Sequence, residues 1–535
     1  MSLTSFGFLL FLAAVVAVYY IVPKKIQWIV LLAASYGFYL SSGLDHAAYI
    51  VATTLFTYAA GPLMQRIRTS GQAQIARAGQ DITKERKREI KKAADRKIHR
   101  IQVLTVLVNL SVLAYFKYLN FFIGGLNEAF GFFRWDFSLP MVNLLAPLGL
   151  SYYTFNTIGY LIDVGRGKLA AETHLGRFAL FVSFFPSIVQ GPLNRYGDLG
   201  PQLSAPHKFD YNNLKFGAQL MLWGFFKKLV IADRVAPIVS TIFTPSFTNY
   251  SGSHIVIAVI AYSLQIYGDF SGGVDIIRGA AQMLGIDLPL NFSRPFFATS
   301  MADFWRRWHM SLGAWMREYV FYPIMLSRPV TAVSKFARKR LGSYAGKIVP
   351  SVAAPLVVFF LIGIWHGLTS QYIVNGLYNA LLISASVACA PLFRKLTEKL
   401  HIHTDTFSFR LFQMIRTFCL MCISRIIVKA PSLSDAWKML RSVFTSIDLA
   451  FATGADGAYA VYGLPGPDIA VLAVAVLIVL VVGILQERGV RIRETLARQG
   501  LVFRWSMVLL LLFGVLIFGL YGPSYNASSF IYGRF

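Results

Sequence analysis

The chain alternates long apolar stretches with short polar segments. Twelve of these stretches approach the ~20 residues that a helix needs to cross the hydrocarbon core of a bilayer. They lie near residues 4–22, 26–41, 47–64, 102–122, 144–163, 216–232, 253–268, 349–365, 371–388, 408–424, 467–486 and 504–521. The pattern predicts an all-α, polytopic bundle of about ten to twelve transmembrane helices.

Composition and charge agree with a membrane location. Hydrophobic residues make up 56% of the 535 residues, more than one soluble core would bury. The net charge of +26 would suggest a nucleic-acid partner in a soluble protein. Here, however, Lys and Arg cluster in short segments between apolar stretches, which is typical of cytoplasmic loops. We therefore expect a cell-membrane protein in contact with lipid, with no nucleic-acid partner.

Basic residues also predict the orientation of the first spans. Lys24 and Lys25 directly follow the first apolar stretch, which has no basic residue before it and no small-residue cleavage site after it. Residues 65–100 hold 12 Lys or Arg against 4 acids. We expect a retained anchor with the N-terminus outside and a basic cytoplasmic arm at 65–100. The arm is either a topological tether or a docking surface for an acidic carrier protein or anionic lipid.

These features divide the chain into four expected parts. They are N-terminal transmembrane helices at 1–64, the arm at 65–100, a core at 101–390 and C-terminal transmembrane helices at 391–535. Within the core, Pro and Gly interrupt apolar sequence at 166–213 and 268–300. Irregular backbone at membrane depth is tolerated only where protein or a water-filled cavity satisfies its polar groups. We therefore expect a large interior cavity.

No metal site or disulfide framework is indicated. Cys389, Cys419 and Cys422 lie in or beside apolar stretches, and His401 and His403 have no carboxylate or cysteine at zinc-ligand spacing. The sequence contains no phosphate-binding loop or dinucleotide fingerprint. We expect no bound metal or cofactor.

The first candidate for chemistry is the segment 300–323. Ser300 and Asp303 form a capping-box pattern, which predicts a helix that begins near 301. Residues four apart would share one face of this helix: Trp305, His309, Gly313 and Arg317, with Arg306 three residues before His309. A histidine at membrane depth is costly to leave unpaired. His309 is therefore either directly functional or a structural residue in a hydrogen-bond network.

The second candidate is the segment 356–380. His366 ends a strongly apolar stretch, and Asn375 follows in the next one. A neutral imidazole there has the basicity to take a proton from a hydroxyl that attacks a thioester. On spacing alone, a histidine that bonds a backbone carbonyl at a helix end is the simpler interpretation. Asp269, an acid within an apolar stretch, is either functional or ties down a helix break.

Six blocks taken together resemble the membrane-bound O-acyltransferase superfamily. They are PLGLSYYTFNTIGYLIDVGRG (147–167), FFPSIVQGPLNRY (184–196), GFFKKLVIADR (224–234), DFSGGVD (269–275), FWRRWHMSLGAWMREY (304–319) and IWHGL (364–368). They are most similar to the bacterial alginate O-acetyltransferase branch and next to the teichoic acid D-alanyl transferases. The chain departs from the family pattern at Asn156, Gly273 and Val274, where Gln, Tyr and Ser are usual.

The resemblance implies a helical fold around a central tunnel, which the acyl donor enters from the cytoplasm and the acceptor from outside. It implies His366 as the catalytic histidine and His309 as a second one that orients the donor or supports the tunnel. The expected donor is a thioester, acetyl-CoA or an acyl carrier protein. Weaker candidates for substrate binding are Asn375, Trp305, Arg306, Arg317 and Asp269.

The resemblance also implies the overall reaction. We expect O-acylation, preferably acetylation, of an extracellular or cell-envelope polysaccharide, either directly or through a secreted acyltransferase partner. D-alanyl transfer to teichoic acid and non-catalytic transport of acyl groups are the alternatives.

Overall fold

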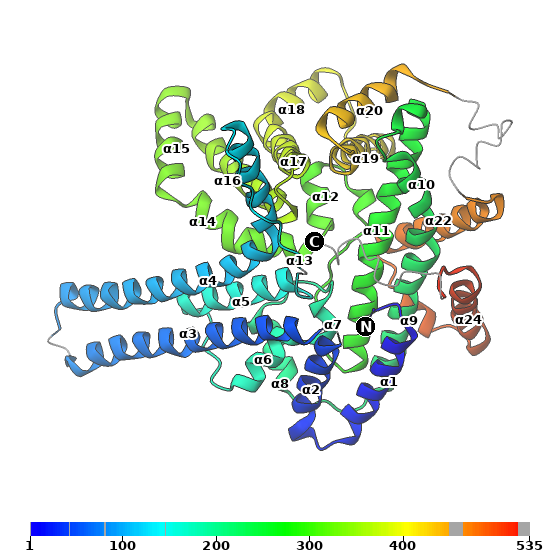
Figure 1. The fold of residues 1–535 in the computed structure, drawn as a ribbon. Coiled ribbons are helices and arrows are strands. Elements are labelled where there is room, and N and C mark those ends of the chain that lie inside the picture. The colour runs from blue at the N-terminus through cyan, green and yellow to red at the C-terminus, as the bar shows by residue number, and fades with distance from the viewer. Residues whose placement is uncertain (1, 42, 80–81, 145, 449–463, 523–535) are drawn as a thin grey trace. The chain divides into compact units, whose positions relative to one another are not determined.

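A computed structural model describes residues 2–522 except 42, 80–81, 145 and 449–463. Residues 449–463 and 523–535, which belong to the expected block 391–535, lie outside the described residues. The described residues form helices joined by loops and contain no β-strand (Figure 1). The predicted all-α fold is confirmed.

Seven of the described helices are long and apolar enough to cross a membrane. They are α3 (Leu44–Arg77), α4 (Lys84–Phe132), α11 (Gly252–Met283), α16 (Ser343–His366), α19 (Phe407–Lys429), α22 (Gly466–Glu487) and α24 (Leu501–Phe518). The pair α17 (Ser370–Ala388) and α18 (Ala390–Lys399), bent by 58°, forms an eighth if it counts as one span. The polytopic architecture is confirmed, with fewer long spans in this part of the chain than the expected ten to twelve.

Other apolar stretches form shorter helices. The first two are α1 (Phe6–Ile21) and α2 (Gln27–Leu40), of 16 and 14 residues, and α5 (Leu150–Arg166) has 17. The expected interruption at 166–213 is confirmed, because this stretch holds only short helices before α9. They are α6 (Leu175–Ser183), α7 (Phe185–Ile188) and α8 (Tyr196–Ser204), and α9 spans Tyr211–Phe225.

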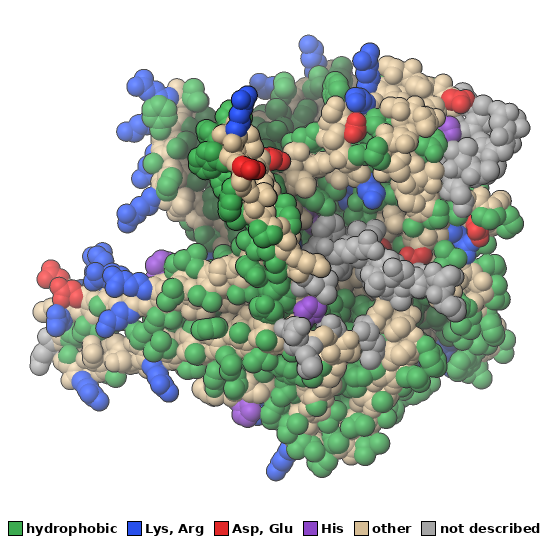
Figure 2. Space-filling model, viewed as in Figure 1, with side chains coloured by type: hydrophobic (Ala, Val, Ile, Leu, Met, Phe, Trp, Pro, Cys, Tyr) green, Lys and Arg blue, Asp and Glu red, His purple; other side chains and the backbone are tan. Residues whose placement is uncertain are grey.

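The chain divides into two compact units. Unit 1 comprises 1–218 and 277–289, and unit 2 comprises 219–276 and 290–535. In unit 1, α3 and α4 lie side by side as a long antiparallel hairpin (Figure 1). The far ends of these two helices form the arm at 65–100, and Lys and Arg side chains cluster over them (Figure 2). The arm is therefore a helical hairpin with an exposed basic surface.

Unit 2 carries both candidate histidines. Its long helices are most of α11 together with α16, α17, α19, α22 and α24. Its shorter elements include the π-helix η3 (Phe226–Ala232), α10 (Asp233–Ile242), η5 (Pro295–Phe297), α12 (Met301–Arg307), α13 (Met310–Met316), the π-helix η6 (Arg317–Phe321), α14 (Tyr322–Met325), α15 (Arg328–Leu341), α18, α20 (Leu433–Thr445) and α23 (Ile492–Ala497). In this unit α16 and α17 cross closely, since a Cβ on Gly376 would lie 2.4 Å from the Phe359 carbonyl oxygen. Glycine at 376 therefore permits the close approach of the two helices at Phe359, about two helical turns before His366.

Buried ion pairs join η3 to α11. Lys228 is 1% exposed, and its Nζ lies 2.6 Å from Asp269 Oδ1 and 2.8 Å from Asp233 Oδ1. Lys227, 3% exposed, pairs with Asp275 at 2.7 Å and donates to Ser271 Oγ at 2.9 Å. Charges removed from water are stable only when paired and hydrogen-bonded. These contacts therefore fix the π-helix against α11.

The sequence suggested irregular backbone from residue 268 onward, and this is wrong for its first part. The helix α11 continues without a break through Asp269 to Met283. Asp269 does not tie down a helix break, because its carboxylate is held by Lys228. The irregular backbone begins only after Met283.

We predict that Lys228→Met strongly destabilises the protein. The substitution leaves Asp269 and Asp233 without their shared cation, and breaking a buried pair by removing one partner costs about 3–5 kcal/mol. The measurement is the melting temperature of the detergent-solubilised protein. Glu89→Gln is the control, because it removes an exposed Arg86–Glu89 pair worth about 1 kcal/mol or less. Equal melting temperatures for the two variants would contradict the structural role of the cluster.

Candidate functional site

The helix α12 begins as the sequence predicts. Ser300 is its N-cap, and its Oγ accepts a hydrogen bond from the Asp303 backbone N–H at 3.1 Å. The Asp303 carboxylate in turn accepts from the Thr299 N–H at 3.3 Å. The first bond satisfies a backbone donor that the helix start leaves unpaired, and the second ties the residue before the N-cap to the first turn. The predicted start near 301 is confirmed.

The predicted continuous helix through His309 is wrong. The helix α12 ends at Arg307, Trp308 is extended, and His309 adopts the left-handed conformation with φ 46° and ψ 53° before α13 begins. Trp305 and His309 consequently do not share a helix face with Gly313 and Arg317. The left-handed residue redirects the chain, and such a conformation is unusual for a residue other than glycine.

A second segment, residues 291–294, pairs with this break. The Ser293 N–H donates to the Arg307 carbonyl and the Met310 N–H to the Asn291 carbonyl, both at 2.9 Å. The Asn291 side chain is fully buried, and its Oδ1 also accepts from Ser311 through the backbone N–H and the hydroxyl, at 3.0 and 2.9 Å. Three backbone groups at the break, the Arg307 carbonyl and the N–H groups of Met310 and Ser311, are therefore satisfied within the protein.

Asn291 also fixes the protonation pattern of His309. The His309 Nδ1 lies 3.1 Å from Asn291 Oδ1. The Ser311 backbone N–H can only donate, so the atom that it contacts must be the amide oxygen. His309 Nδ1 therefore carries the proton and donates to that oxygen, which leaves the lone pair on Nε2. His309 lies outside the candidate spans, and its burial lowers the pKa to about 3, so the imidazole is neutral.

His366 occupies a different environment. It is the last residue of α16 and is half-buried. Its ring stacks on Tyr372 with centroids 5.7 Å apart and an interplanar angle of 21°, and it contacts Trp365 at 4.6 Å. The expectation that a helix ends at His366 is confirmed. Aromatic rings on two helices thus restrict the orientation of an imidazole that is still partly accessible.

A polar network links α12 to the helices around His366. Trp305 Nε1 donates to Asn379 Oδ1 at 3.1 Å, and the Trp305 ring contacts Phe359 of α16. Asn379 Nδ2 donates to the Asn375 carbonyl at 2.8 Å, and Ser424 Oγ of α19 donates to Asn375 Oδ1 at 2.6 Å. The structure therefore brings together two of the predicted residues, Trp305 and Asn375, through Asn379. Sequence reasoning did not select Asn379 or Ser424 as site residues, although both are polar residues within apolar stretches.

The remaining predicted residues lie elsewhere. Arg306 is exposed and lies 3.4 Å from the Asp303 carboxylate, Arg317 is exposed at the start of η6, and Asp269 is paired with Lys228. His309 and His366 share unit 2 but contact different elements. Within the described part of the chain, no three His, Cys, Asp or Glu side chains gather as metal ligands would.

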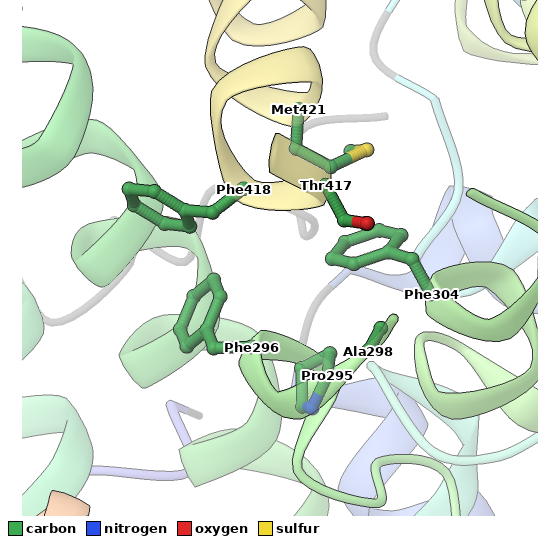
Figure 3. A pocket seen from close by; sticks show the side chains of 7 residues that line it. All are labelled: Pro295, Phe296, Ala298, Phe304, Thr417, Phe418 and Met421. Carbon is green, nitrogen blue, oxygen red and sulfur yellow. The ribbon is translucent and has the colours of Figure 1, made fainter. Parts of the chain in front are cut away.

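A small apolar pocket lies beside α12 (Figure 3). It is lined by Pro295, Phe296, Ala298, Phe304, Thr417, Phe418 and Met421. The only hydroxyl among these side chains is that of Thr417, which donates to the Gln413 carbonyl at 2.7 Å. The lining contains no acid or base, so this pocket is not where proton transfer takes place.

Comparison with known proteins identifies the family. Residues 168–428 match the MBOAT, membrane-bound O-acyltransferase family. The probable alginate O-acetylase of Azotobacter vinelandii is 30% identical over 439 residues, which cover 82% of this chain and 76% of that protein. The chain belongs to the membrane-bound O-acyltransferase family. It is therefore an O-acyltransferase of this family, and the resemblance noted in the sequence is confirmed.

Two other relatives match smaller parts of this chain. The peptidoglycan O-acetyltransferase of Helicobacter pylori is 28% identical over 367 residues, 64% of each chain. The teichoic acid D-alanyltransferase of Bacillus subtilis is 31% identical over 267 residues, 49% of this chain and 62% of that protein. The region matched to the membrane-bound O-acyltransferase family contains both candidate histidines but neither α22 nor α24.

Proposed function

We propose that this protein transfers an acetyl group from a cytoplasmic thioester toward a hydroxyl of an extracellular or cell-envelope polysaccharide, with His366 as the general base. The relatives named above as alginate and peptidoglycan O-acetylating proteins cover more of the chain than the D-alanyltransferase does. This difference in coverage favours acetyl over D-alanyl transfer. The observation that carries the role of His366 is its half-buried position between aromatic rings at the end of α16.

The proposed step is a single acyl transfer. A ring nitrogen of His366 takes the proton of the acceptor hydroxyl as its oxygen attacks the thioester carbonyl carbon. The new C–O bond forms, the C–S bond breaks, and the imidazolium returns the proton to the departing thiolate. Histidine is the side chain that most often performs such proton transfers in enzymes. Because His366 takes one proton from the hydroxyl and passes one proton to the thiolate, it ends the step in its starting form. The step therefore needs no bound cofactor.

His309 has a supporting role in this proposal. Its imidazole is neutral and 4% exposed, and Asn291 holds the proton on Nδ1. The Nε2 lone pair is then fixed in direction and suited to accept a hydrogen bond from a donor or acceptor group. The Trp305–Asn379–Asn375 network ties this region to α17. These contacts connect the surroundings of the two histidines, as a tunnel shared by both would require.

The charge pattern supports a cytoplasmic position for the His309 segment. Arg307, two residues before His309, pairs with Glu487, and Glu487 directly precedes a basic cluster at Arg488, Arg491 and Arg493. Such clusters face the cytoplasm. The donor, acetyl-CoA or an acyl carrier protein, would therefore approach from the His309 side. The acceptor on the outer side is the polysaccharide itself or a secreted acyltransferase partner.

We predict that His366→Ala lowers transfer by about 10²- to 10⁴-fold, the usual contribution of a general base. The measurement is the initial rate of labelled acetate incorporation into envelope polymers, in cells that lack the native gene and carry each variant at equal membrane abundance. His403→Ala is the control, because His403 is exposed in a loop. Activity above half of wild type in His366→Ala would exclude the base and favour a transporter that performs no chemistry.

We predict that deletion of the gene lowers ester-linked acetate on the isolated envelope polymers and leaves ester-linked D-alanine unchanged. The reason is that the acetylating relatives match a larger share of the chain. Both esters are measured after mild alkaline release. Loss of D-alanine with unchanged acetate would contradict the acetyl assignment while preserving the acyltransferase.

A further inference from the structure

Glu487, the last residue of α22, contacts the segment that carries His309. Its two carboxylate oxygens accept hydrogen bonds from Arg307, Nη1 to Oε2 at 3.0 Å and Nη2 to Oε1 at 3.1 Å. Oε2 also accepts from Arg294 Nε at 2.6 Å. Glu487 lies well beyond residue 428, where the family match ends. A residue outside the matched region thus binds beside a candidate catalytic segment.

The two arginines belong to the two chain segments that meet at the break, 291–294 and 307–311. Arg307 immediately precedes the extended Trp308 and left-handed His309, and Arg294 ends the segment that supplies Asn291. Arg294 is itself left-handed, with φ 50°. Two such backbone conformations persist only when the surrounding contacts determine them. Beside the Asn291 amide, which binds His309 and Ser311, the Glu487 carboxylate is a second side-chain group that joins both segments.

Electrostatics explains why this contact needs a carboxylate. Without it, Arg294 and Arg307 would face each other as like charges, with only Asp303 bound to Arg307 Nε at 3.1 Å. The side chains of Arg294, Arg307 and Glu487 are 28%, 21% and 23% exposed, so water screens the pair only partly. A two-bond Arg–carboxylate contact also fixes direction as well as distance.

We propose that Glu487 is a positioning residue for His309. Its carboxylate clips Arg307 to Arg294, and this keeps Asn291 where its Oδ1 accepts the hydrogen bond from His309 Nδ1–H. Loss of the clip would let the 307–311 backbone relax and shift the His309 imidazole from its position against Asn291. This inference rests on the role of His309 in the proposed function. It extends the functional machinery to a C-terminal helix that the family match does not cover.

The other end of the same helix provides a matched control. Asp468, at the start of α22, pairs with Arg234, which also donates to the Phe518 carbonyl. The 22 residues of α22 span about 33 Å at the usual rise, so the two ion pairs lie at opposite ends of one membrane-spanning helix. Asp468→Asn and Glu487→Gln each weaken an ion pair of α22, but only Glu487 touches the His309 segment.

The first experiment compares these two variants in full-length protein. Glu487→Gln keeps the shape of the side chain but removes its charge, and we expect the labelled-acetate rate to fall about tenfold, since small misplacement of a reacting group is costly. Asp468→Asn should transfer at the wild-type rate. The melting temperatures of both solubilised proteins should fall by similar amounts. A wild-type rate in Glu487→Gln, or equal rate losses in the two variants, would overturn the proposal.

The second experiment tests whether Glu487 acts through His309. In the His309→Ala background, Glu487→Gln should lower the rate no further, because residues that act as a unit are not additive. A further tenfold loss in the double variant would show that Glu487 acts elsewhere and would overturn the proposal. If His309→Ala is impaired but Glu487→Gln transfers at the wild-type rate, the positioning role of Glu487 is excluded and the role of His309 in the proposed function remains. By contrast, activity above half of wild type in His366→Ala would contradict the proposed function itself, whatever rates the Glu487 variants show.

Discussion

Polar and charged groups inside an apolar membrane protein have to find their partners within the protein, since lipid supplies none. In unit 2 this constraint determines the local structure around the candidate site. Lys227 and Lys228 are satisfied by carboxylates of α11, which attaches the π-helix to that span. The break at His309 is satisfied by Asn291 and Ser293. The positions of the functional side chains follow from these contacts.

The two histidines differ in ways that match different roles. His309 is deeply buried, neutral and held in one protonation pattern by an amide oxygen. His366 lies at a helix end, half-buried, with its ring against Tyr372. A general base must reach a substrate hydroxyl, which the more accessible imidazole can do. A fixed, buried imidazole is better suited to orient a bound group. The Trp305 network joins their surroundings without placing the two rings in contact with the same elements.

Much of the local structure could be predicted from the sequence. Ser300 and Asp303 fixed the start of α12, because a capping box involves residues only three apart. The end of α16 at His366 followed from the apolar pattern. The break at His309 could not be predicted, because Trp305, His309 and Gly313 have helical spacing and the stabilising contact comes from Asn291, 18 residues earlier. Asp269 was open to two interpretations until its partner Lys228 was located.

Long-range contacts explain why the supporting residues of the site could not be predicted from the sequence. Glu487 is 180 residues from Arg307, and no local pattern marks an acid at the end of an apolar helix as part of a site. The resemblance to the membrane-bound O-acyltransferase family indicated both histidines but not the residues that hold them. Family motifs identify reacting groups, whereas their supporting contacts depend on how distant helices pack.

The central claim is that His309 and His366 serve one reaction. The most direct measurement is a cryo-electron microscopy structure of the full chain with an acetyl-CoA analogue in which a thioether replaces the thioester. We expect the acetyl end of the analogue to lie within hydrogen-bond reach of His366. We expect the same cavity to expose Nε2 of His309, nearer the cytoplasm. An analogue bound away from both histidines, or imidazoles that face lipid, would contradict it.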